Sequence, residues 1–125
     1  ADFTLSFRLL SHWLLNTPFP ESIEMPLYQS NAFKKWTKKW ENRLKNEKGS
    51  RQNQATMMND VNPLYIPRNH LVEKAIQEGL QNEDFSFMKR LNDLWASPYE
   101  HHDGCEVFIK PATDEEKIRY TYCGT

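Results

Sequence analysis

NPLYIPRNHLVEKAI, residues Asn62 to Ile76, places two prolines spaced by four ahead of a helical apolar pattern. Each proline fixes its own φ and disfavours the α region for the residue before it. Pro67 suits the first position of a helix, where its missing N–H would have no partner in any case. The sequence therefore predicts a rigid turn that leads into a helix over residues 67–81. Its predicted apolar stripe comprises Leu71, Val72, Ala75, Ile76 and Leu80.

A second helix is predicted over residues 84–96. We expect Asp84 to cap its start, since a carboxylate there accepts a bond from an unpaired amide, and Pro98 to end it. The predicted inner face comprises Phe87, Met88, Leu91, Leu94 and Trp95. The helical pattern is then lost, and alternating apolar residues indicate short extended pieces near residues 106–109 and 118–122. Residues 97–125 are therefore predicted to form an irregular, partly extended tail.

Three more helices are predicted upstream, over residues 2–15, 31–48 and 50–60. The first is apolar around most of its circumference, so we expect it to be buried on more than one side, with Asp2 as its cap. Asn31 is expected to cap the second and Gly49 to stop it, while prolines keep the stretch up to about Ser30 irregular. The predicted inner faces comprise Phe3, Phe7, Leu10 and Leu14 in the first helix, Phe33, Trp36, Trp40 and Leu44 in the second, and Ala55, Met58 and Val61 in the third.

The composition is that of an ordinary folded protein, with 38% hydrophobic and 26% charged residues in 125. We therefore predict a mostly α fold of about five helices with an irregular tail, formed by residues 1–125 as a single helical region. The chain opens with Ala1 and enters a helical pattern at once, so we expect it to be a piece of a longer protein. No apolar run reaches the roughly 18 residues of a membrane helix, so no membrane partner is expected. Signal-peptide features are not recognised, which favours a cytoplasmic, bacterial location, with mitochondria as the eukaryotic alternative.

Charge is distributed unevenly, although the net charge is −1. Eight basic and two acidic residues lie between Asn31 and Arg51, whereas eleven acidic and four basic residues lie between Glu73 and Glu116. The basic helix with Trp36 and Trp40 has two interpretations, a surface for nucleic acid or the solvated side of a helix that packs on a core. The second is favoured because the tryptophans lie on the apolar face, so no nucleic-acid partner is expected.

No local motif indicates an active site in this chain. The four glycines are isolated from one another, so no phosphate-binding loop is present, and no Ser/His/Asp or Cys/His motif is found. His101, His102, Asp103 and Cys105 are metal-ligand residue types, but their spacing does not match a zinc site. Catalytic, cofactor-binding and metal-binding residues are therefore not expected here.

Two smaller features remain open. Arg68, Asn69 and His70 lie where a helix start could bind an anion, but we favour their tying the two-proline turn to neighbouring backbone groups. Cys105 and Cys123 are too few for a disulfide scaffold, although a single bridge between them is possible.

The Asn62–Ile76 stretch, taken with later residues, resembles the last part of the selenoprotein O family. The residues that carry the resemblance are the motif Asn62, Pro63, Tyr65, Pro67, Arg68 and Asn69, then Asp84, Phe85, Ser86, Leu91, Leu94, Pro98 and Tyr99, and finally Tyr122, Cys123, Gly124 and Thr125. The upstream helices also resemble the segments that precede this part, so the resemblance covers essentially the whole chain. Two departures are Pro67, where many members have Leu, and Cys-Gly-Thr in place of Cys-Ser-Ser at the end.

The resemblance implies a helical region appended to a kinase-like fold that transfers AMP from ATP to Ser, Thr and Tyr hydroxyls of proteins, using Mg²⁺. It implies that the ATP, metal and catalytic residues lie N-terminal to this chain, in a kinase-like core that is the expected partner, together with the protein substrates. Cys123 takes the place of the family's redox-active cysteine or selenocysteine and is thereby implied to be regulatory. The alternative is a stand-alone helical module that binds another protein.

Overall fold

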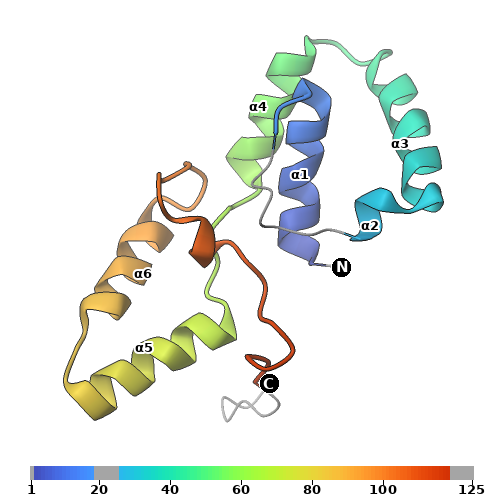
Figure 1. The fold of residues 1–125 in the computed structure, drawn as a ribbon. Coiled ribbons are helices and arrows are strands. Elements are labelled where there is room, and N and C mark those ends of the chain that lie inside the picture. The colour runs from blue at the N-terminus through green and yellow to red at the C-terminus, as the bar shows by residue number, and fades with distance from the viewer. Residues whose placement is uncertain (1, 19–25, 119–125) are drawn as a thin grey trace, which may run out of the picture. The chain divides into compact units, whose positions relative to one another are not determined.

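The computed structural model describes residues 2–18 and 26–118, and over these ranges the chain is helical without β-strands (Figure 1). Its contacts divide it into two compact units, residues 1–62 (unit 1) and residues 63–125 (unit 2). The predicted mostly α class is therefore confirmed. That residues 1–125 act as one region stays a prediction.

Unit 1 contains four α-helices in its described part: α1 (Phe3–Leu15), α2 (Pro26–Gln29), α3 (Asn31–Leu44) and α4 (Arg51–Val61). α1 and α4 pack side by side (Figure 1). Asp2 caps α1 as predicted, since its carboxylate accepts the N–H of Leu5 at 2.8 Å. Ser50 caps α4 in the same way, with 3.2 Å between its hydroxyl and the N–H of Asn53.

Three predicted details of unit 1 are wrong. The stretch before Ser30 is not wholly irregular, because Pro26 begins the short helix α2 and proline is tolerated in a first turn. Ser30 rather than Asn31 caps α3, since its hydroxyl accepts a backbone N–H of the first turn at 3.1 Å. α3 ends at Leu44, and the chain then turns before Gly49, which adopts a φ of 112°.

The core of unit 1 lies around α1, which is buried on more than one side, as predicted. Its buried apolar residues are Leu5, Leu9, Leu10, Leu14, Phe33 and Ala55. The predicted inner face differs at Phe3 in the first turn, which is 77% exposed. α4 packs along α1, and α3 meets α1 as well, where the ring of Trp13 lies 6.0 Å from that of Phe33 between centroids. Phe7, Trp36 and Val61, also predicted to face inward, are likewise exposed.

An arginine lies among the buried residues of α1. Arg8 is 6% exposed, and its Nη1 donates to the carbonyl oxygens of Asn59 and Asn62, each at 2.8 Å. Ser11 adds a bond from its hydroxyl to Oδ1 of Asn59 at 2.5 Å. These carbonyls lie at the end of α4, where helix carbonyls have no amide partner in the next turn. Arg8 therefore binds the C-terminal end of α4.

Unit 2 is built on the helices α5 (Asn69–Asn82) and α6 (Ser86–Ala96), followed by a short 3₁₀ helix (Glu106–Phe108). α5 and α6 pack together, and Glu83 between them adopts the left-handed conformation with a φ of 52°. Their core comprises Leu71, Ala75 and Leu91, with Phe87, Met88, Trp95 and Phe108 packed against it. The predicted inner face of residues 84–96 is confirmed, since Leu94 is also buried.

The start of α5 differs from the prediction. The helix begins at Asn69 rather than at Pro67, because the N–H of Arg68 donates to the carbonyl of Ile66 at 2.8 Å in a tight turn around the proline. The stripe is also shorter than predicted. Leu80 is 75% exposed and Ile76 is exposed, so only the first half of α5 carries core residues.

Two further details of unit 2 concern residues 84–108. Asp84 accepts the N–H of Ser86 at 2.9 Å, as a cap does, although it lies one residue before the capping position. This hydrogen bond holds the pKa of Asp84 below its ordinary value. The extended piece predicted near residues 106–109 is wrong, because Glu106–Phe108 form a 3₁₀ turn that brings Phe108 against Phe87, with 5.6 Å between the ring centroids.

Candidate functional site

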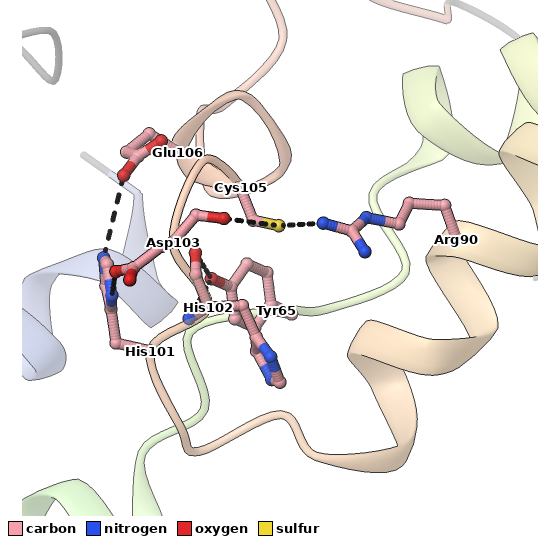
Figure 2. A network of polar contacts seen from close by, with 7 residues as sticks. All are labelled: Tyr65, Arg90, His101, His102, Asp103, Cys105 and Glu106. Carbon is pink, nitrogen blue, oxygen red and sulfur yellow. Dashed lines mark hydrogen bonds and ion pairs between the residues drawn. The ribbon is translucent and has the colours of Figure 1, made fainter.

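The two-proline turn holds the segment that follows α6. The N–H groups of Leu64 and Tyr65 both point to the carbonyl of Pro98, at 2.7 and 3.4 Å. The Tyr65 hydroxyl accepts the N–H of His102 at 3.1 Å, and the two rings lie 5.4 Å apart between centroids. Figure 2 shows the tyrosine hydroxyl directed at this part of the loop. The turn and the loop are thus joined by backbone and side-chain bonds in unit 2.

Tyr65 is a buried phenol with a defined partner. Burial raises the pKa of Tyr65 above its ordinary value of 10.0, against the smaller lowering effect of its bond to His102. Nε2 of His102 in turn donates to the carbonyl of Ser97 at 3.1 Å. At neutral pH the phenol is therefore protonated and positions the loop.

The thiol of Cys105 is fully buried beside an arginine. Nη2 of Arg90 donates to Sγ at 2.9 Å, and Sγ lies 3.7 Å from the carbonyl oxygen of Asp103 (Figure 2). We call Tyr65, Arg90, His102 and Cys105 the Tyr65–Cys105 cluster. A thiol with no solvent contact reacts slowly with external reagents, so the geometry gives this cysteine a packing and hydrogen-bonding role.

His101 lies on the exposed rim of the same loop. Its Nδ1 is 3.4 Å from Oδ1 of Asp103, and its Nε2 is 3.8 Å from Oε1 of Glu106 (Figure 2). In the described ranges no group of three or more His, Cys, Asp and Glu side chains is placed to hold a metal ion. The ligand-type side chains of this loop therefore contact one another or nearby groups: His101 pairs with Asp103 and Glu106, His102 bonds to Ser97, and Cys105 bonds to Arg90.

The predicted motif residues are divided between the two units. In unit 1, Asn62 receives the bond from Arg8 and donates from Nδ2 to the carbonyl of Met58 at 2.7 Å. In unit 2, Tyr65 and Arg68 are buried, while Pro67 and Asn69 are exposed. Pro63 is half-buried at the start of that unit. Cys123 lies outside the described residues, so its regulatory role stays a prediction.

Sequence reasoning missed the polar residues that organise both units. Arg8 was noted only as an interruption of an apolar helix, although an arginine at a core-facing position signals a buried partner. Arg90 and Cys105 carried no signal, because their contact depends on how the loop after α6 returns to that helix.

Among the described residues each unit also contains a groove of about 500 Å³. In unit 1 a groove of about 480 Å³ lies among α1, α3 and α4, lined by residues such as Phe7, Trp36 and Met57. In unit 2 a groove of about 500 Å³ lies between α5 and the residues after α6. Burial lowers the pKa of His70 at the rim of the second groove, against the raising effect of Glu116. No helix among the described residues is both long and apolar enough to span a bilayer.

Comparison with known proteins identifies the family of the chain. The family model described as protein adenylyltransferase SelO matches residues 5–95. The chain is 35% identical to a protein nucleotidyltransferase YdiU of Rhizobium leguminosarum and 37% identical to one of Bacillus thuringiensis. Each match covers 100% of this chain but only 25% and 24% of the relative, so the chain spans about a quarter of their length. No solved structure matches it. On the family model and these identities, the chain belongs to the protein adenylyltransferase SelO family.

Proposed function

We propose that this chain is the helical C-terminal region of a protein adenylyltransferase and that the reacting groups lie in the rest of the polypeptide. The observation that carries the proposal is that all of the chain aligns with relatives named nucleotidyltransferases, yet spans only a quarter of them. The proposed reaction joins a Ser, Thr or Tyr hydroxyl oxygen of a protein substrate to the α-phosphorus of ATP and releases pyrophosphate. ATP and Mg²⁺ would be held by the kinase-like core. A cytoplasmic location fits the bacterial sources of the relatives.

The test of this proposal is AMP transfer by the full-length protein that carries this chain. With ATP labelled at the α-phosphate and a protein acceptor, we expect the full-length protein to label the acceptor and the 125-residue chain to leave it unlabelled. An acceptor labelled by the chain alone would overturn the assignment of the chemistry to the rest of the polypeptide. A full-length protein without transfer activity would overturn the proposed reaction.

For the two cysteines we expect different reactivity. Cys105 is fully buried, and a buried thiol reacts only through local opening, so Cys123 should be alkylated about tenfold faster or more. Peptide mapping after timed exposure to iodoacetamide measures both rates in one sample. The Cys123→Ser variant is the matched control and should show only the slow reaction. Equal rates at the two positions would contradict this expectation.

A regulatory role of Cys123 requires a further result. In the oxidised full-length protein we propose that Cys123 forms a disulfide with a cysteine of the kinase-like core. Mapping that always finds Cys123 reduced would refute the role.

The alternative function, a stand-alone module that binds another protein, is favoured by one observation, the uneven charge, with eight basic and two acidic residues between Asn31 and Arg51. A free-standing module should be a monomer that binds little hydrophobic dye. A region that has lost its partner surface should bind the dye or self-associate, because monomeric proteins rarely leave contiguous apolar patches above a few hundred Å² in water. Light scattering and dye fluorescence together distinguish a stand-alone module from a region that has lost its partner surface.

A further inference from the structure

The groove of unit 1 is apolar on three sides. We call it the unit 1 groove, and it is lined by Phe7 and Leu10 of α1, Trp36 and Trp40 of α3, and Met57 and Val61 of α4, among others. Its volume is about 480 Å³, which is larger than a packing defect and large enough to take several side chains. Methionine side chains such as that of Met57 adapt readily to the shape of a partner.

The side chains around this groove are more exposed than their chemistry favours. Met57 and Val61 are each 69% exposed and Trp36 is 45% exposed. Phe3, which is also exposed, extends the patch, since its ring centroid lies 4.9 Å from that of Phe7. Trp36 stacks on Trp40 with 5.6 Å between centroids and 10° between the ring planes. An apolar surface of this kind marks a contact site in soluble proteins.

A row of cations lies next to the stacked tryptophans. Lys35, Lys39 and Arg43 follow one another at a spacing of four on α3, directly beside the Trp36–Trp40 row. Within the described ranges Arg43 pairs with the exposed Glu47, while no acidic side chain pairs with Lys35 or Lys39. A partner that covers the tryptophans therefore meets two unpaired ammonium groups at its edge.

We propose that the unit 1 groove holds an amphipathic helix from the part of the same polypeptide that lies outside this chain, with acidic residues of that helix facing Lys35 and Lys39. The proposal rests on the proposed function, in which this chain is part of a longer transferase. Grooves between helices bind amphipathic helices through apolar anchors at a helical spacing. The relatives are about four times as long as this chain, so a segment in the same polypeptide is the nearest available occupant. The attraction between its acidic residues and the lysines at the rim fixes the orientation of the docked helix.

Thiol labelling of the Met57→Cys variant tests whether the rest of the polypeptide covers the unit 1 groove. Because Met57 is 69% exposed, the new thiol should react quickly in the 125-residue chain and at least about tenfold more slowly in the full-length protein, where labelling requires local opening. Thr56→Cys is the matched control, because Thr56 is the exposed neighbour on α4 that does not line the groove. It should react quickly in both proteins. Peptide mapping separates these thiols from Cys105 and Cys123.

Charge reversal tests whether acidic residues of the docked helix face Lys35 and Lys39. In the full-length Met57→Cys protein, Lys35→Glu with Lys39→Glu should raise the labelling rate at position 57 about tenfold, because like charges then oppose each other at the rim. Lys34→Glu with Lys38→Glu changes the net charge equally on the other side of α3 and should leave the rate unchanged.

Three results would overturn the docking proposal. The first is fast labelling of position 57 in both proteins, which leaves the groove open. The second is slow labelling of the 125-residue chain at a concentration where light scattering shows a monomer, which means that the groove is covered without the rest of the polypeptide. The third is failure of either matched control, seen as equal protection of positions 56 and 57 or as an equal response to the two charge reversals. AMP transfer by the same full-length sample is measured in parallel, so that a failed docking site and a failed transferase assignment are told apart.

Discussion

Replacing Arg8 by Met is expected to lower the free energy of unfolding of unit 1 by about 3 kcal/mol, because two charge-assisted hydrogen bonds are lost. Nη1 of Arg8 donates to the carbonyl oxygens of Asn59 and Asn62, each at 2.8 Å. Methionine keeps much of the length of the side chain and fills the space against α4, but it has no donor. The two carbonyls would then lie in a water-poor site without the charged donor that stabilises them.

The magnitude follows from where these carbonyls lie. The last carbonyls of a helix have no amide partner in a following turn, and the negative end of the helix dipole favours a cation there. A hydrogen bond to a charged group contributes roughly 1.5–3 kcal/mol, and the burial of Arg8 limits replacement by water. Arg8→Lys keeps the charge but offers different donor geometry, so we expect a smaller loss than for Met.

Amide hydrogen exchange of α1 and α4 in the 125-residue chain is the measurement, since it reports unit 1 separately from unit 2. Arg43→Met is the matched control. The Arg43 side chain is 81% exposed and pairs only with Glu47, so its loss should change stability by no more than about 0.5 kcal/mol. If α4 exchanges at the same rate in Arg8→Met as in Arg43→Met, the assigned role of Arg8 is wrong.

Arg8 also shows where the sequence was informative and where it was not. The apolar periodicity predicted the helices because burial of one stripe is a local property, and the inner face of α6 was predicted correctly. Periodicity does not say how many neighbours a helix has. Phe3 and Leu80 repeat at the spacing of a core stripe, yet both are exposed, because no helix of the described residues covers them in their unit.

Helix ends were harder to predict for a different reason. Several side chains compete for each end, and the local turn decides which one is used. Ser30 caps α3 although Asn31 beside it is an equally good capping residue type, and the turn around Pro67 takes the N–H of Arg68 before α5 starts. Arg90 and Cys105 lie fifteen positions apart, and the loop between them has no apolar periodicity. The sequence pattern therefore did not predict their contact.

Replacing Tyr65 by Phe is expected to lower the free energy of unfolding of unit 2 by about 2 kcal/mol, within the range for leaving a buried hydrogen-bonding group unsatisfied. The hydroxyl of Tyr65 accepts the N–H of His102 at 3.1 Å, and the ring is buried beneath that loop. Phenylalanine preserves the ring packing, including the 5.4 Å approach to the His102 ring, so the change isolates the hydroxyl. Exchange of α5 and α6 amides is the measurement, and exchange of α4 amides in unit 1 is the internal control.

The pH dependence of stability tests whether the Tyr65 phenol is buried in its neutral form. Burial raises the pKa of Tyr65 in the folded protein above its ordinary value of 10.0, so the unfolded chain loses the phenolic proton first as pH rises. The stability that depends on the neutral phenol is therefore fully present below pH 10 and falls as pH rises from 10 toward the folded pKa. Phenylalanine has no such proton, so the stability difference between the parent and Tyr65→Phe should shrink above pH 10. A difference that stays constant through this range would mean that the phenol is not shielded from water, and the assigned burial of Tyr65 would be wrong.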